Sequence, residues 1–359
     1  MTQVDGANES LRREPLASRK NSAYPAAGMH PLLSASLLAI VAAALSWALV
    51  GLYTRAMMAS RRVEAPNARS MHRVPVPVGG GIAIVATALI LWPLWQGALS
   101  RPHLLLLACF AGLGALSWID DRRGLSPAVR FTAQAVAVAL CISALAPEAR
   151  VFPILPVAVE RLLTGLAWLW FINLFNFMDG IDGLAGSEAI AVVLGYLLLA
   201  SVAGLDGPLR PLALIVAASA AGYLFWNWHP AKVFMGDAGA IPLGFLLGWL
   251  MLDLALRGYW AAGLILPLYF VADATLTLIR RGLRGEKPWQ AHREHFYQRA
   301  VLGGATPPGV VWRVGAANAA LIALAVLSAR YPVPALAAAI AVVAALLAHL
   351  QRLAGPRAS

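Results

Sequence analysis

Five aspartates stand near glycines at the ends of long apolar runs, namely Asp120, Asp121, Asp179, Asp182 and Asp237. A carboxylate at the edge of a membrane is costly unless it binds something, so solubility alone does not explain this set. Ordinary loop charge accounts for Glu64 and Glu286 and is the preferred explanation for Glu188. Clustered carboxylates suit a hard cation such as Mg²⁺, and Mg²⁺ suits phosphate substrates.

The first motif is the adjacent pair Asp120-Asp121. Two neighbouring carboxylates repel, so one holds its proton more tightly, which suits a proton acceptor or a neighbour of a metal. Ser126-Pro127 is typical of a helix N-cap followed by proline at the first helical position. Arg130 would then lie near the start of the next helix, within reach of a phosphate. For an isolated Asp-Asp pair, a cluster of helix-cap and loop charges is the competing explanation.

The second motif places polar residues at every third position, at Asn173, Asn176, Asp179 and Asp182. Neighbours in this series lie on adjoining parts of a helix face. Gly180 and Gly183 let the backbone turn or a ligand approach closely. Polar contacts between helices are the alternative.

The third motif is Gly236-Asp237-Ala238-Gly239, at the entrance of an apolar run. An aspartate between glycines there fits a cation or phosphate site, although a tight turn would give the same pattern.

The fourth motif is His292-Arg293-Glu294-His295, within the basic loop 280–299. A basic, histidine-bearing loop beside acidic metal sites can clamp a diphosphate. A loop that only sets membrane topology explains part of its charge.

Two further features allow two explanations each. The triplet Gly79-Gly80-Gly81 permits backbone contact with a ligand and is equally consistent with a hinge. Asp273 lies inside an apolar run, where a functional role and structural pairing with a neighbouring helix are about equally expected.

The elements that must position these residues are transmembrane helices. The 359-residue chain is 60% hydrophobic and 13% charged, with a mean hydropathy of +0.71. A soluble domain could not bury that much apolar surface. Roughly 20 apolar residues span a bilayer core. Such runs occur near 31–55, 79–99, 102–118, 129–146, 155–176, 185–204, 208–227, 239–256, 259–279, 307–329 and 332–351. We therefore expect an all-α, polytopic integral membrane helical bundle of about 11 transmembrane helices.

Short connections between the runs predict one membrane-embedded domain over 31–352 and a short cytoplasmic tail over 353–359. Residues 1–30 are polar and are expected to form a disordered tail instead of a signal peptide, with Met29 as an alternative start. Cys109 and Cys141 lie inside apolar runs and are expected to be core residues.

Counted over alternate loops, lysine and arginine are concentrated on one side of the membrane, the side that carries the loops near 56–78, 119–128, 177–185, 228–238 and 280–306. The positive-inside rule places these loops in the cytoplasm. The net charge of +11 is then explained by topology and anionic headgroups, and no nucleic acid is expected. The four motifs all lie on this side of the membrane.

In this order, the segments resemble the polyprenyl-phosphate N-acetylhexosamine-1-phosphate transferases of the glycosyltransferase family 4 type. The resemblance runs from about Arg69 to Arg299. It rests on the combination of Asp-Asp-x-x-Gly-Leu, Asn-x-x-Asn-Phe-x-Asp-Gly-Ile-Asp-Gly, Phe-Met-Gly-Asp-Ala-Gly and His-Arg-Glu-His. It implies transfer of N-acetylhexosamine-1-phosphate from a UDP-N-acetylhexosamine to undecaprenyl phosphate, with Mg²⁺ or alternatively Mn²⁺. The location implied is the cytoplasmic face of a bacterial inner membrane, and the product would start an envelope glycan such as O-antigen.

The resemblance also implies residue roles. Asp237 and Asn176 would hold Mg²⁺. Asp120 would deprotonate or orient the lipid phosphate with support from Asp121, and these two are the catalytic residues together with Asp237. The substrate-binding residues would be Arg130 and Asn173, then Asp179, Asp182 and Gly183 near the uridine, and His292, Arg293 and His295 near the diphosphate or sugar. Direct attack is favoured over a covalent aspartyl intermediate, which stays open.

Three alternatives remain. A phospho-N-acetylmuramoyl-pentapeptide transferase would carry a run of adjacent histidines, whereas this chain has His292-Arg293-Glu294-His295. A transporter would place polar groups near mid-membrane and show internal repeats. A non-catalytic lipid-binding relative would be expected to lose Asp120 or Asp237. A homodimer is left open.

Overall fold

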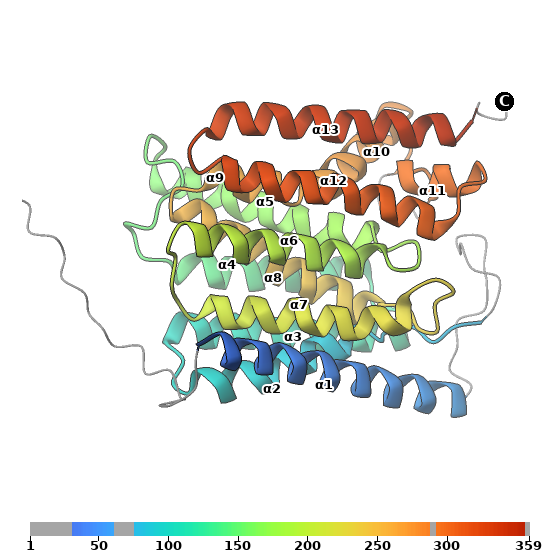
Figure 1. The fold of residues 1–359 in the computed structure, drawn as a ribbon, viewed down its shortest axis with the longest axis horizontal. Helices are drawn as coiled ribbons and strands as arrows, with labels where there is room; N and C mark the ends of the chain where they lie inside the picture. Colours follow the sequence, from blue (N-terminus) through green and yellow to red (C-terminus); the bar gives the residue numbers. More distant parts are fainter. Residues whose placement is uncertain (1–30, 61–74, 288–291, 356–359) are drawn as a thin grey trace, which may run out of the picture.

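The computed structural model describes residues 31–60, 75–287 and 292–355. The regular elements in these ranges are all α-helices, which confirms the predicted all-α class (Figure 1). The predicted tail over 1–30, the alternative start at Met29 and the loop residue Arg69 lie outside the described residues.

Thirteen helices occur in the described ranges. They are α1 (Pro31–Ala59), α2 (Ile82–Gln96), α3 (Arg101–Arg123), α4 (Pro127–Ser143), α5 (Val157–Phe177), α6 (Leu184–Val202), α7 (Leu209–Asn227), α8 (Asp237–Leu256), α9 (Trp260–Ile265), α10 (Leu268–Leu283), α11 (Phe296–Leu302), α12 (Pro307–Leu327) and α13 (Pro332–Leu353).

Eight of the described helices are long and apolar enough to cross a membrane, so the chain is a multi-pass membrane protein, with fewer full-length spans than the eleven expected. α2 and α4 are apolar but shorter, with 15 and 17 residues. The expected run over 259–279 is not one continuous helix. It is divided into α9 and α10 around Pro267, which has no backbone N–H to continue the helical ladder. The seven-residue α11 was not expected.

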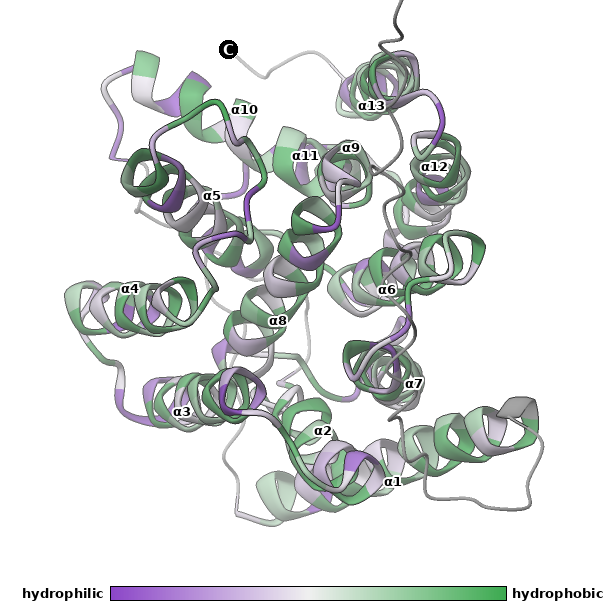
Figure 2. Ribbon diagram, turned by 90° about the vertical axis from the view of Figure 1, so that its left-hand side faces the viewer, coloured by the Kyte–Doolittle hydropathy of each residue, from purple (hydrophilic) through white to green (hydrophobic). Residues whose placement is uncertain are grey.

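Helix α8 lies at the centre of the bundle, surrounded by the other helices (Figure 2). Every residue from Ala238 to Leu252 is buried. Its glycines let α5 approach closely, since a Cβ on Gly248 would lie 2.3 Å from Trp168 Cδ1. Trp168 instead stacks on Phe245 with ring centroids 4.7 Å apart and donates Nε1–H to the Phe245 carbonyl. This packing holds the middle of α8 against the middle of α5.

Local chemistry sets where the helices begin and end near the candidate residues. Ser126 accepts the Val129 N–H at the start of α4, and Pro127 occupies the first helical position, which confirms the predicted N-cap. Gly124 ends α3 with φ +66°, a conformation that favours glycine, and its N–H bonds the Asp120 carbonyl at 2.8 Å. The tight turn between these helices returns Arg130 toward the end of α3.

Candidate active site

The ends of α3 and α5 meet the beginnings of α4 and α8 at one end of the bundle, on the right in Figure 1. Arg130 Nη1 donates to Asp237 Oδ2 at 2.8 Å and to Asp120 Oδ2 at 3.0 Å. Asn176 Nδ2 donates to Asp237 Oδ1 at 2.8 Å. Four residues from three of the sequence motifs therefore form one connected cluster, which we call the carboxylate cluster.

Asp121 belongs to the same region but contacts main chain. Its Oδ1 accepts the Asp237 N–H and its Oδ2 accepts the Ala238 N–H, both at 3.0 Å. These are the first N–H groups of α8, which have no partner within the helix. Asp121 therefore anchors the helix start that carries Asp237, while Asp120 faces Arg130. The sequence did not distinguish these two environments.

The Gly79-Gly80-Gly81 triplet packs against the segment that leads into α8. The N–H groups of Gly80 and Gly81 donate to the carbonyls of Phe234 and Met235 at 2.9 and 3.0 Å. A Cβ on Gly81 would lie 2.5 Å from Gly239 Cα, so a side chain has no room there. The close approach that the sequence suggested is thus made by backbone on backbone, directly beside Asp237.

The loop between α5 and α6 carries Asp179 next to the carboxylate cluster. Desolvation by its surroundings, together with the negative charges of Asp237 and Asp121, raises the pKa of Asp179 to about 7. Positive charge brought into this region, from a cation or an arginine, would lower that pKa again.

Asp182 and Gly183 join this loop to the one before α8. Asp182 Oδ2 contacts His229 Nδ1 at 2.6 Å and accepts the Ala231 N–H at 3.1 Å. The Gly183 N–H donates to Asn227 Oδ1, and Asn227 Nδ2 donates to the Val233 carbonyl, each at 2.9 Å. The loops that carry Asp179 and Asp237 are thereby held together. Asn227 was not selected from the sequence, because a buried amide among tryptophans gives no spacing signal.

Asn173 lies one helical turn before Asn176. Its Nδ2 donates to Gln134 Oε1 and to the Leu169 carbonyl, both at 2.8 Å. The Gln134 bond connects α5 to α4, which carries Arg130. Asn173 therefore helps to hold α4, with Arg130, against α5, with Asn176.

The fourth motif reaches the site through α11. The rings of His292 and His295 lie 4.9 Å apart, and His295 is 2% exposed. Arg293 is half-buried beside them. Tyr297 Oη donates to the Phe177 carbonyl at 3.3 Å, next to the loop that carries Asp179. The motif therefore adjoins the Asp179 side of the site.

Glu294 of the same motif is paired with α10. Arg281 and Arg284 each donate to its carboxylate. Burial opposes ionisation of Glu294, but these two guanidinium groups outweigh it and hold the pKa of its carboxyl below the usual value. Glu294 thus anchors the chain directly after His292 and Arg293.

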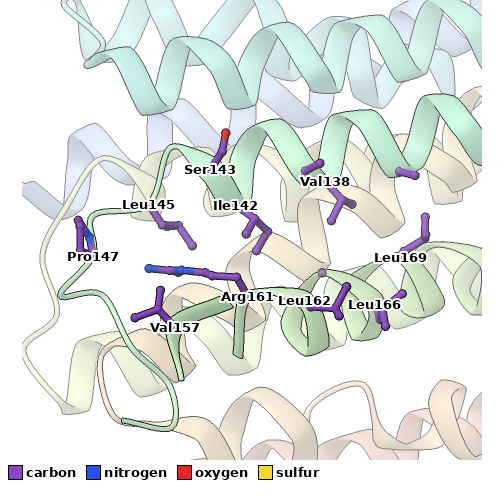
Figure 3. Close-up of a pocket in the computed structure, with 13 residues that line it drawn as sticks. Val138, Ile142, Ser143, Leu145, Pro147, Val157, Arg161, Leu162, Leu166 and Leu169 are labelled. Atoms are coloured by element: carbon purple, nitrogen blue, oxygen red, sulfur yellow. The ribbon is translucent and has the colours of Figure 1, made fainter. Parts of the chain in front are cut away.

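Two apolar grooves flank α5. One, of about 550 Å³, lies between α4 and α5, where Arg161 reaches toward Leu145 and Pro147 (Figure 3). The Arg161 guanidinium donates to the carbonyls of Ala146 and Ala149 at 2.8 Å. The other groove, of about 480 Å³, runs along α5 beside α8 and α9 as far as Leu174, two residues before Asn176. The second groove therefore leads from the hydrophobic flank of the bundle toward the carboxylate cluster.

Comparison with known proteins finds one matching family model and several similar phospho-sugar transferases. The family model described as glycosyl transferase family 4 matches residues 103–255, a range that contains the whole carboxylate cluster. A probable undecaprenyl-phosphate N-acetylglucosaminyl 1-phosphate transferase of Bacillus subtilis is 30% identical, over 67% of this chain and 70% of the relative. A decaprenyl-phosphate N-acetylglucosaminephosphotransferase of Mycolicibacterium smegmatis is 28% identical, over 76% and 77%. A phospho-N-acetylmuramoyl-pentapeptide-transferase of Microcystis aeruginosa is 27% identical, over 83% and 88%.

Proposed function

The chain belongs to glycosyl transferase family 4, and on this basis we propose that it transfers N-acetylhexosamine-1-phosphate from a UDP-sugar to undecaprenyl phosphate. An oxygen of the lipid phosphate would attack the phosphorus bonded to the sugar. The bond from that phosphorus to the bridging oxygen breaks, and UMP leaves with that oxygen. The products are undecaprenyl-diphospho-N-acetylhexosamine and UMP.

The meeting of Asp120, Arg130, Asn176 and Asp237 carries this proposal. These residues come from four different helices and converge at one end of a membrane bundle. A substrate anchored in the bilayer and one dissolved in water can both reach such a place. Cationic and hydrogen-bonding groups there would offset the repulsion between two phosphates before in-line attack.

The residues of the cluster fit a hard cation. Mg²⁺ takes oxygen ligands and is usually held by one or two carboxylates together with substrate phosphates. The Asp237 carboxylate supplies such a ligand, and half a turn of the Asn176 amide exchanges its nitrogen for its oxygen. We propose Mg²⁺ at Asp237 and Asn176, with Mn²⁺ as a substitute. When bound, the ion would neutralise phosphate charge.

The remaining roles follow from what each side chain contacts. Arg130 is half-exposed and bridges two carboxylates, so an incoming phosphate can exchange places with either of them. Asp120 is buried, contacts the same Arg130 nitrogen as Asp237, and would orient the lipid phosphate or accept its proton. Asp121 holds the start of α8 in place. Direct attack needs no further group.

The acceptor chain and the membrane side can be assigned on the same grounds. The groove along α5 that ends at Leu174 would take the isoprenoid chain and bring its phosphate toward Asn176. The basic loops gather on the face that carries the cluster, so the positive-inside rule supports a cytoplasmic site in a bacterial inner membrane.

The proposal also names the sugar of the donor. The His292-Arg293-Glu294-His295 sequence favours UDP-N-acetylglucosamine or a related simple sugar, and hence the start of an envelope glycan such as O-antigen. The Microcystis relative is named for a muramoyl-pentapeptide substrate, so that donor is the alternative to be tested.

The test is an assay of the purified protein in lipid nanodiscs with undecaprenyl phosphate, Mg²⁺ and a panel of UDP-sugars, following UMP release. UMP from UDP-N-acetylglucosamine is the expected result. Release only from UDP-N-acetylmuramoyl-pentapeptide would move the chain to the alternative donor. Failure to release UMP from any of these donors would overturn the proposed reaction.

A further inference from the structure

Asp273 is an aspartate buried within α10 that the proposed reaction does not use. Its side chain is 0% exposed. A carboxylate in apolar surroundings is costly unless several donors satisfy it. Two donors come from its own helix, the hydroxyl of Tyr269 at 3.2 Å and that of Thr277 at 3.4 Å.

The other donors come from His295 and the start of α11. Asp273 Oδ1 accepts the Phe296 N–H at 3.0 Å, and Oδ2 accepts the Tyr297 N–H at 3.3 Å. These are the first two N–H groups of α11, which have no partner within that helix. His295 Nδ1 also lies 3.3 Å from Asp273 Oδ1. Both oxygens of Asp273 are therefore committed to the segment that follows Glu294.

This segment connects two of the sequence motifs. On one side, His295 contacts His292, with ring centroids 4.9 Å apart. On the other, Tyr297 Oη donates to the Phe177 carbonyl, and a Cβ on Gly180 would begin 2.1 Å from that hydroxyl oxygen. The loop that carries Asp179 thus rests directly on α11, and α11 is held by Asp273.

We infer that Asp273 is a positioning residue for donor recognition. It sets the distance between His292 and the Asp179 loop by holding His295 and the first turn of α11 against α10. Because Asp273 accepts the His295 Nδ1–H, the imidazole ring is held in one orientation, and Nε2 is the ring nitrogen that can contact another group. This inference rests on the proposed function, because it takes these two motifs as the binding surface for the nucleotide sugar.

Asp273→Asn tests the inference with little change in volume. One acceptor oxygen is replaced by an N–H donor that faces a backbone N–H or a hydroxyl. We expect KM for the UDP-sugar to rise about tenfold, the effect of one lost charge-assisted hydrogen bond. KM for undecaprenyl phosphate should stay within about twofold. Binding of UDP alone, measured by calorimetry, should weaken by a similar factor.

Asp253→Asn is the matched control. Asp253 is also a helix aspartate that accepts a tyrosine hydroxyl, from Tyr196 at 2.9 Å, and it pairs with Arg257 at the opposite end of α8. Its substitution should leave both KM values unchanged. If Asp273→Asn alters both KM values equally, or neither, the positioning role is wrong.

Tyr297→Phe decides the matter if Asp273→Asn does not fold. It removes only the hydroxyl that contacts Phe177 and leaves the Asp273 contacts in place. A selective rise of the donor KM supports the inference, and unchanged kinetics overturn it. Wild-type protein that releases no UMP at all would instead overturn the proposed function, so the two failures are distinguishable.

Discussion

The carboxylate of Asp121 accepts the backbone N–H of Asp237 at 3.0 Å. Two acidic residues that lie 116 positions apart are therefore joined through main chain and not through a shared ligand. The bond places Asp237 at the first position of α8, with its side chain turned toward Asn176 and Arg130. Asp121 thus holds the start of α8, whereas the adjacent Asp120 contacts Arg130, and we propose that Asp120 acts on the substrate.

Asp121→Asn should weaken both the fold and the response to metal. Asparagine offers one acceptor oxygen where two N–H groups need acceptors, so we expect unfolding to become easier by about 1–2 kcal/mol. Displacement of Asp237 should also raise the Mg²⁺ concentration needed for half-maximal UMP release. Thermal unfolding and a Mg²⁺ titration measure the two effects.

Thr306→Ala provides the control for Asp121→Asn, because Thr306 caps α12 by accepting the Gly309 N–H at 3.2 Å. It should cost about 1 kcal/mol of stability and leave the Mg²⁺ titration unchanged. Equal behaviour of the two variants in the titration would show that Asp121 has only a capping role.

Asp237→Ala and Asp120→Asn should each abolish turnover while the protein stays folded in the membrane. Asp237 is the proposed metal ligand, and Asp120 is the buried carboxylate opposite Arg130. Rates of UMP release and gel-filtration profiles of the purified variants test this. Asp206→Ala is the comparison, since Asp206 forms an exposed ion pair with Arg210 that is worth little. Normal rates in both cluster variants would refute the site.

Arg130→Met should make stability more dependent on divalent cations. Arg130 supplies the positive charge between Asp120 and Asp237, so its removal leaves two carboxylates without that charge. We expect the melting temperature without Mg²⁺ to fall, and added Mg²⁺ to restore more of it than in the wild type. kcat/KM should fall at least about tenfold, the effect of one charged hydrogen bond.

Arg130→Lys separates charge from geometry. Both carboxylate contacts come from the single nitrogen Nη1, so a lysine ammonium can keep the positive charge there, but it lacks the further guanidinium N–H groups that could hold a phosphate. It should retain most of the metal-free stability and lose part of the activity. If Arg130→Met melts like the wild type at every Mg²⁺ concentration, Arg130 does not neutralise the cluster.

The sequence predicted which residues form the carboxylate cluster better than it predicted how they contact one another. Apolar length indicated the membrane helices, and three-residue spacing brought Asn173 and Asn176 to the end of α5. The break at Pro267 was missed because hydropathy averages over the interruption between α9 and α10. Spacing also could not show that Asp273 bonds α11, because that pairing joins residues 23 positions apart through backbone N–H groups.

The roles within each motif were harder to predict for a physical reason. Asp120 and Asp121 are neighbours on one helix and therefore point in different directions, but the sequence does not show what lies in either direction. His292 and His295 looked equivalent, whereas only His295 is fully buried against Asp273. Partners supplied by distant segments decide such differences.

Gly81→Ala should be strongly destabilising, and Gly112→Ala should not. A Cβ on Gly81 would lie 2.5 Å from Gly239 Cα, where backbone has to move, so we expect a loss of about 1–3 kcal/mol. Because Gly239 follows Asp237 by two residues, turnover should fall as well. Gly112 lies inside α3, where an added Cβ would meet nothing within 4 Å. Alanine there should raise the free energy of unfolding by as much as about 1 kcal/mol. Thermal unfolding and UMP release of the pair measure both effects, and equal behaviour of the two variants would contradict close packing of the glycine triplet on α8.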